Sequence, residues 1–132
     1  MSKKKKIDKS KDNTVRSVNN NIRFSVRKLY PILKGIVGKK VDVAIRNLLF
    51  SEKRITKEIR KTISSAVANA ENNNQYDIDK LIVKEAYCGK KIVMKRFRPR
   101  AKGRAAPILK PYSSITIILS EAKQMENLGT KS

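Results

Sequence analysis

Residues 95–111 read KRFRPRAKGRAAPILKP, a run in which Lys and Arg recur at every second position. Successive side chains of an extended chain point to opposite faces, so the cations from Arg96 to Arg104 would project from one face. The other face would carry Phe97 together with proline, alanine and glycine. Neither face is apolar enough to join a hydrophobic core. The pattern therefore predicts an extended segment that stands apart from the body of the protein.

A tight reversal of the chain is expected near the middle of this run. Gly103 permits the backbone angles of a tight turn, and it lies about midway between a strand that starts near Lys91 and a strand that ends at Ser120. We expect a β-hairpin over residues 90–112 with its tip at residues 101–105. Strands of about ten residues, at ~3.3 Å per residue, carry that tip ~30 Å from the sheet. Two strands alone are marginally stable in water, so this arm needs a partner.

Apolar residues recur at helical spacing in three segments before the arm. The first helix is expected to follow an N-cap at Ser25 and to stop at Gly38. Pro31 falls inside this helix, where it removes a donor and clashes one turn back at a cost of about 3 kcal/mol. The first helix therefore either kinks at Tyr30 or is replaced by two short helices. A second helix is expected over residues 41–49.

The third helical segment has the clearest periodicity in the chain. Ser51 is its expected N-cap, with Glu52 in its first turn. Its apolar stripe recurs every four residues at Ile55, Ile59, Ile63 and Val67. We expect this helix to form the centre of the core and to end in the polar run at residues 71–75.

The period changes after residue 78, where apolar and β-branched residues predict strands. These strand-like stretches are residues 81–87, 92–94 and 114–120. Gly89 marks a turn or a bulge between the first two, and an edge strand over residues 14–18 is expected to end at the asparagines that follow it. The predicted fold class is α+β, with three helices packed on a small antiparallel sheet and a long protruding β-hairpin.

A single α+β domain that includes the hairpin is expected over residues 14–120, because 132 residues suffice for one modest core. Residues 1–13 contain six lysines and almost no apolar side chain. We expect them to form a flexible basic tail that is either solvated or in contact with phosphates. Residues 121–132 are expected to form a polar C-terminal tail.

The composition excludes most classes of function. Lys and Arg number 32 against 11 Asp and Glu, a net charge of +21, so a polyanion such as nucleic acid is the expected partner. No histidine occurs and Cys88 is the only cysteine, which excludes His-based catalysis, disulfides within the chain and His-ligated zinc. We expect no catalytic residue, no cofactor and no metal. The chain has neither an apolar run that spans a membrane nor a secretory signal, so a cytoplasmic protein is expected.

The arm concentrates positive charge without local counterions. No Asp or Glu occurs between residues 86 and 120, where the cations are Lys90, Lys91, Lys95, Arg96, Arg98, Arg100, Lys102, Arg104 and Lys110. The guanidinium group of arginine matches phosphate oxygens and stacks on bases. A thin arm with small residues fits between packed helices, which favours structured RNA over duplex DNA. The alternative is a charged loop without a fixed partner.

The residues from Met94 to Ala105, with Ile108-Leu109-Lys110 after them, closely resemble the signature of the bacterial large-subunit ribosomal protein twenty-two family. The resemblance continues in Ser25-Val26-Arg27-Lys28 and Gly38-Lys39-Lys40-Val41, and in residues 66–72 at the end of the long helix. Order and spacing agree from about residue 16 to residue 120.

Membership in this family would imply a structural protein of the large ribosomal subunit that also acts early in assembly. Its body would lie near the polypeptide exit, and its hairpin would penetrate the ribosomal RNA (rRNA). The implied partners are 23S-type rRNA in several of its domains, neighbouring large-subunit proteins and the nascent polypeptide, with no membrane and no homo-oligomer. The expected rRNA-binding residues are the nine arm cations together with Arg23, Arg27, Lys28, Lys39 and Lys40. The expected tunnel-lining tip is Arg100, Ala101, Lys102, Gly103, Arg104 and Ala105.

The strongest rival is a DNA-architectural protein of the histone-like kind, which also uses basic β-arms with a proline that wedges between base steps. In that class the helices and the arm occur in a different order. An RNA-processing enzyme built on Glu85 or Asp77 is the weakest reading, because solvated carboxylates beside a strand account for both residues.

Overall fold

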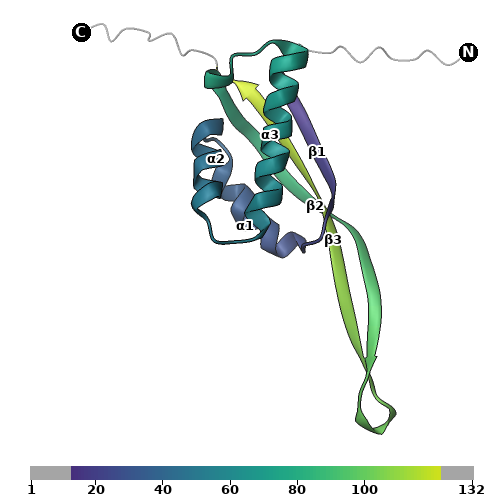
Figure 1. The fold of residues 1–132 in the computed structure, drawn as a ribbon. Helices are drawn as coiled ribbons and strands as arrows, with labels where there is room; N and C mark the ends of the chain where they lie inside the picture. Colours follow the sequence, from purple (N-terminus) through teal and green to yellow (C-terminus); the bar gives the residue numbers. More distant parts are fainter. Residues whose placement is uncertain (1–12, 123–132) are drawn as a thin grey trace, which may run out of the picture.

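Three helices lie against one face of a three-stranded antiparallel sheet, and two of the strands continue past this body as a long hairpin (Figure 1). The computed structural model describes residues 13–122, so most of both predicted tails lies outside the described residues. The strand order is β1-β3-β2. The elements are β1 (Thr14–Ile22), α1 (Val26–Ile36), α2 (Val41–Phe50), α3 (Ile55–Asn74), the 3-10 turn η1 (Ile78–Lys80), β2 (Leu81–Pro99), the 3-10 turn η2 (Ala101–Gly103) and β3 (Ala105–Glu121). The predicted α+β fold is confirmed.

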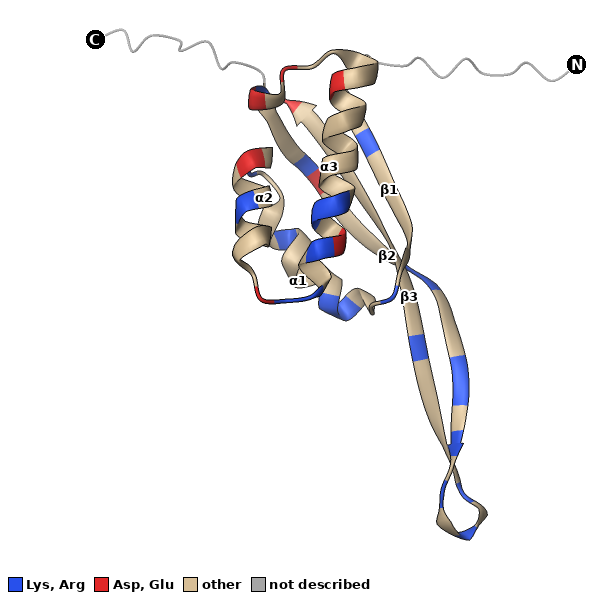
Figure 2. Ribbon diagram, in the orientation of Figure 1, with Lys and Arg blue, Asp and Glu red and all other residues tan. Residues whose placement is uncertain are grey.

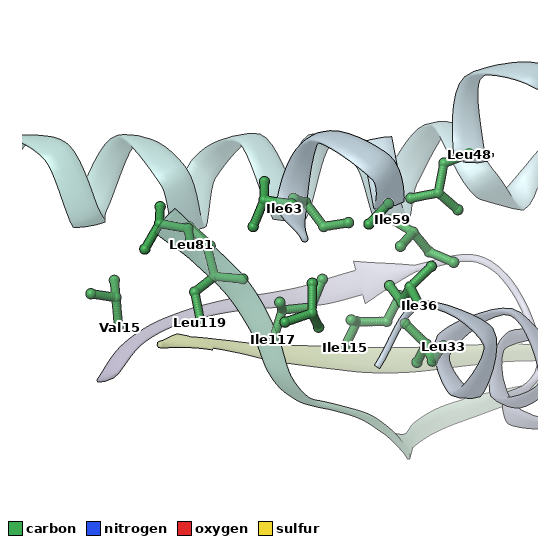
Figure 3. Close-up of a cluster of buried hydrophobic side chains, with 14 of the residues drawn as sticks. Val15, Leu33, Ile36, Leu48, Ile59, Ile63, Leu81, Ile115, Ile117 and Leu119 are labelled. Carbon is green, nitrogen blue, oxygen red and sulfur yellow. The ribbon is translucent and has the colours of Figure 1, made fainter. Parts of the chain in front are cut away.

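Helix α3 supplies the centre of the core, as predicted. Figure 3 shows Ile59 and Ile63 of this helix above the side chains of β3, and both isoleucines are fully buried. The buried stripe then turns to Ala66 and Ala70 instead of Val67, which is only partly buried, because the helix has 3.6 residues per turn rather than four. These two alanines let α3 lie close to the sheet.

Helix α1 is one uninterrupted helix, so the prediction of two short helices is wrong. Pro31 lies in its interior and is exposed. The buried side chains of Leu29, Leu33 and Ile36 hold the helix against the body. Burying a large aliphatic side chain stabilises a protein by about 1.5–3 kcal/mol, so three of them outweigh the ~3 kcal/mol cost of an internal proline. The predicted stop is confirmed, since Gly38 follows the helix with a φ of 80°.

The boundary between α2 and α3 differs from the prediction. Ser51 ends α2 as its C-cap instead of beginning α3, which starts at Ile55. The first turn of α3 is closed by Thr56, whose hydroxyl donates to the Lys53 carbonyl at 2.6 Å. The sequence spacing puts Leu49 on one apolar stripe with Val41, Ala44, Ile45 and Leu48, but its side chain is 58% exposed. The buried residues of α2 are Val41, Ala44 and Leu48.

Strand β1 is the predicted edge strand, but the asparagines do not end it. It continues to Ile22 across an irregular register between Asn19 and Ile22. Ile22 is buried to 1% exposure. Burial of this side chain therefore keeps the chain on the sheet through a polar stretch of low strand propensity.

A turn or a bulge was predicted at Gly89, but strand β2 runs without interruption through this residue, which pairs regularly with Ser114 of β3. The register shifts instead between Val83 and Glu85, and again between Lys90 and Ile92. A bulge therefore lies next to Gly89 and a turn does not occur. Strand β3 is longer than predicted, because it also forms the returning strand of the hairpin.

Candidate nucleic-acid interface

The arm, residues 90–112 with its tip at residues 100–105, leaves the body at the end opposite to η1 (Figure 1). Its strands stay paired from Lys90 opposite Ser113 to Pro99 opposite Ala105. At the tip the Arg100 amide donates to the Arg104 carbonyl at 2.6 Å. The predicted β-hairpin and the position of its tip are therefore confirmed.

Two residues of the tip have left-handed backbone angles. Gly103 has a φ of 71°, as its expected role in the reversal requires, and Lys102 has a φ of 62°. A left-handed lysine is unusual, because a side chain with a Cβ disfavours this region. Its presence ends the alternation of faces that the sequence predicts up to Arg100.

The strand register places the arginines of the arm on one face. Residues directly opposite each other in an antiparallel pair share a face. Arg96 lies opposite Ile108, Arg98 opposite Ala106, and Lys110 opposite Met94. We call the face with Arg96, Arg98 and Lys110 the cationic face of the arm; the apolar side chains of Met94 and Ile108 lie between these cations. All three are exposed, as their predicted role requires.

The opposite face of the arm is mostly apolar, with Lys95 as its one cation between residues 93 and 111, and the larger apolar side chains on it were missed by the sequence reasoning. Phe97 lies opposite Pro107, and Lys95 opposite Leu109. Phe97 is 75% exposed and Leu109 is 61% exposed. We call Val93, Phe97, Pro107, Leu109 and Pro111 the apolar face of the arm. A small, slim face was predicted from one strand alone, and the returning strand adds the larger apolar side chains.

The bulge at Lys91 changes which side of the sheet the even-numbered residues of β2 face. Within the body, Ala86 and Cys88 pair with core isoleucines of β3 and lie on the helix side of the sheet. The register then passes from Lys90 to Ile92 and skips Lys91. Even-numbered residues of β2 therefore face the helix side from Ala86 to Lys90 and the helix-free side from Ile92 onward. This change puts Arg96 and Arg98 on the helix-free side.

Positive charge on the arm is not neutralised by carboxylates. Figure 2 shows basic residues and no acidic residue along the arm. The two ion pairs found within residues 13–122 both lie in the body, Lys61 with Glu58 at 3.3 Å and Lys80 with Asp77 at 3.0 Å. The second pair lowers the pKa of Asp77 and raises that of Lys80, chiefly through their hydrogen bond.

The remaining predicted site residues divide into two groups. Arg23 lies beside the root of the arm, because the Ser113 hydroxyl donates to the carbonyl of Phe24 at 2.6 Å. Arg27 and Lys28 follow in the first turn of α1. In contrast, Lys39 and Lys40 contact the beginning of β2, at the other end of the body, through Val83 and Ile82. The structure therefore brings the first group to the arm and leaves Lys39 and Lys40 apart from it.

Further cations near the arm root were not predicted as site residues. Lys53, Arg54 and Lys57 surround the start of α3, and Arg54 and Lys57 line a groove together with Arg23. No local pattern relates them to Arg23.

Nothing in the described part of the chain suggests catalysis. Residues 13–122 contain no group of three or more His, Cys, Asp or Glu that could hold a metal. Burial raises the pKa of the half-buried Cys88 thiol, which disfavours the reactive thiolate. No helix in this range is long and apolar enough to cross a membrane.

Comparison with known proteins gives consistent results over nearly the whole chain. The family model for ribosomal protein L22p/L17e matches residues 17–120. The large ribosomal subunit protein uL22 of Pelagibacter ubique is 86% identical over 132 residues, which covers 100% of both chains. Its counterpart in Maricaulis maris is 53% identical over 113 residues, 86% of this chain and 90% of the relative. That of Brucella suis is 48% identical over 124 residues, 94% of this chain and 96% of the relative.

The family match covers almost the whole chain, and the fold includes the expected arm. These findings exclude the histone-like alternative. The chain therefore belongs to the ribosomal protein L22p/L17e family, as a structural, non-enzymatic component of the large ribosomal subunit.

Proposed function

We propose that the arm is the main rRNA-binding element of this protein and that its cationic face binds phosphates of the large-subunit rRNA. The observation that carries the proposal is the separation of faces: Arg96, Arg98 and Lys110 lie together and exposed on a ribbon two strands wide. Arginine binds phosphate oxygens with two parallel hydrogen bonds. A cationic face of this kind fits an RNA backbone that runs alongside the arm.

The exposure of the apolar face supports a partner that encloses the arm. Large side chains such as Phe97 and Leu109 are exposed in the free protein, and an isolated two-stranded ribbon is marginal in water. RNA helices packed around the arm would cover both faces. The arm would then contact more than one rRNA domain and hold these domains together during assembly of the subunit.

The tip, residues 100–105, is proposed to line the wall of the polypeptide tunnel, and the body to lie near the tunnel exit among neighbouring large-subunit proteins. Family membership and the length of the arm support this arrangement. The nascent polypeptide would then be a further contact of Arg100, Lys102 and Arg104. The chain would act there as a single domain over residues 14–120, without forming homo-oligomers.

The first experiment compares two nucleic acids. The full-length protein should bind a large-subunit rRNA transcript more tightly than duplex DNA of equal length at matched salt. Equal binding at every salt concentration would favour the DNA-architectural alternative and overturn the proposal.

The second experiment removes the arginines of the arm. Replacing Arg96, Arg98 and Arg100 with Ala should lower the slope of log K against log salt by up to about 3, because each lost phosphate contact removes ~0.9. A matched variant with Ala at Lys34, Arg46 and Lys84 loses the same charge from exposed sites on the body. The proposal predicts a smaller change for this control, and equal slopes for the two variants would contradict it.

A third experiment separates the tip from the rest of the arm. Deleting residues 100–104 should leave folding of the body and binding to rRNA intact. It should alter the passage of nascent peptides or the action of drugs that bind in the tunnel. Failure of the deleted protein to enter ribosomes would contradict this division of roles.

A further inference from the structure

A groove of about 680 Å³ lies between the end of β1 and the first turns of α3. Its lining includes three cations, Arg23, Arg54 and Lys57, and one acid, Glu58. The carboxylate of Glu58 is already paired with Lys61 at 3.3 Å. The groove therefore has a strong positive excess.

The three cations of the groove have no ion-pair partner among residues 13–122. Their position does not serve the stability of α3 either, since the N-terminal end of a helix favours anions and repels cations. Arg54 is the N-cap residue of α3 and makes no side-chain capping bond. Three cations held together in a concave surface therefore call for an external anion.

A second groove of about 380 Å³ adjoins the first and shares Phe24 and Arg54 with it. Its lining is mostly apolar, with Pro31, Ile32 and Ile55 as well as Phe24, and two more cations lie at its edge, Lys28 and Lys53. A cationic groove next to an apolar one matches a nucleotide, which combines a phosphate with a flat apolar base. Because the chain is a component of the large ribosomal subunit, rRNA is the polyanion around it.

The grooves are fixed relative to the arm. The carbonyl of Phe24 accepts a hydrogen bond from Ser113 at 2.6 Å, and Ser113 is buried at the root of the arm. Figure 2 shows basic residues at the ends of α1 and α3 that lie next to this root. The grooves are on the helix side of the sheet, whereas Arg96 and Arg98 point to the helix-free side. The two cationic regions therefore meet different parts of an RNA.

We propose that the grooves at the arm root are a second rRNA-binding site, which holds an unpaired nucleotide of the large-subunit rRNA. Arg23, Arg54 and Lys57 bind its phosphate groups, and its base packs against Phe24 and Ile32. This inference rests on the proposed rRNA binding and adds a site on the body to that of the arm. It explains why the start of α3 carries cations instead of a capping acid.

The test uses the full-length protein and a large-subunit rRNA transcript. The variant R23A/R54A/K57A should lower the slope of log K against log salt by about 1.4 to 1.8, because the nucleotide has two flanking phosphates and each lost phosphate contact removes ~0.7–0.9. The control variant with Ala at Lys34, Arg46 and Lys84 should change the slope less. The charge-preserving variant R54K/K57R should bind within about twofold of the unmodified protein. Equal slopes for the groove variant and the control would overturn the inference.

The same measurements test the proposal for the grooves separately from the proposal for the arm. Combining the groove variant with the triple arginine variant of the arm should give the sum of the two changes in slope, because independent sites are additive. If only the groove variant lowers the slope, the second site stands and the arm proposal fails. If only the arm variant lowers it, the inference fails. A fully paired RNA duplex should show no effect of the groove variant, and an equal effect on duplex and transcript would refute the unpaired nucleotide.

Discussion

Exchanging two adjacent side chains of the arm tests whether RNA recognises a face or only the total charge. The double variant R96F/F97R keeps the composition and the net charge of +21. Because adjacent residues of a strand point to opposite faces, it moves one guanidinium from the cationic face to the apolar face. Residues 96 and 97 are both exposed and outside the core, so the stability of the body should not change.

The expected loss follows from the number of phosphate contacts. Moving one of the three cations off the face removes about one contact, so the slope of log K against log salt should fall by about 0.9. The decrease in affinity between ~50 and ~200 mM salt should then be about 3.5-fold smaller for the variant than for the unmodified protein. The reverse exchange, M94K/K95M, adds a cation to the same face and should raise the slope. Its gain is reduced because the new lysine lies opposite Lys110, and like charges opposite each other repel.

Filter binding or fluorescence anisotropy with the rRNA transcript at five or more salt concentrations gives the three slopes. Thermal unfolding of each variant checks that the body is intact. Three equal slopes would show that only total charge matters, and would refute the separation of faces as the basis of binding.

Three further predictions concern the body. Replacing Ile63, a fully buried residue of α3, with Ala should lower the free energy of unfolding by about 2–5 kcal/mol in urea titrations, and a loss below ~1 kcal/mol would mean that the core is not centred there. Replacing Ser113 with Ala leaves the carbonyl of Phe24 without its hydrogen bond and should cost about 1–3 kcal/mol, whereas an unchanged melting temperature would show that the bond does not fix the arm root. The Asp77–Lys80 pair should stabilise the fold above the ordinary Asp pKa of 3.8 and below the ordinary Lys pKa of 10.5. This contribution is lost as pH falls through the lowered Asp77 pKa or rises through the raised Lys80 pKa, so the difference in melting temperature between D77N and the unmodified protein should shrink at both extremes, and a difference independent of pH would contradict the pairing.

The features predicted correctly from sequence depend on residues close together in the chain. Gly103 and the alternation of cations before it are enough to predict the hairpin, because both the turn and the alternation are local. The apolar face was missed because it requires the pairing of Phe97 with Pro107 and of Lys95 with Leu109. That register depends on the conformation of the tip, including a left-handed Lys102 that no propensity suggests.

The errors have a common physical cause, which is that burial outweighs local preference. The asparagines after residue 18 disfavour a strand, yet Ile22 keeps the chain on the sheet. Pro31 disfavours a helix interior, yet the buried leucines around it preserve α1. The groove at the arm root was missed for a related reason, since Arg23 and Arg54 meet only in the folded protein.

The alternation of faces along the arm restricts how the arm can change in length. One residue added to each strand of the arm would keep the pairing but turn every side chain beyond it to the other side of the sheet. Two residues added to each strand would restore Arg96 and Arg98 to the helix-free side. Arms that keep the same orientation toward their surroundings can therefore lengthen or shorten only in steps of two residues per strand, about 6.8 Å of reach at a time.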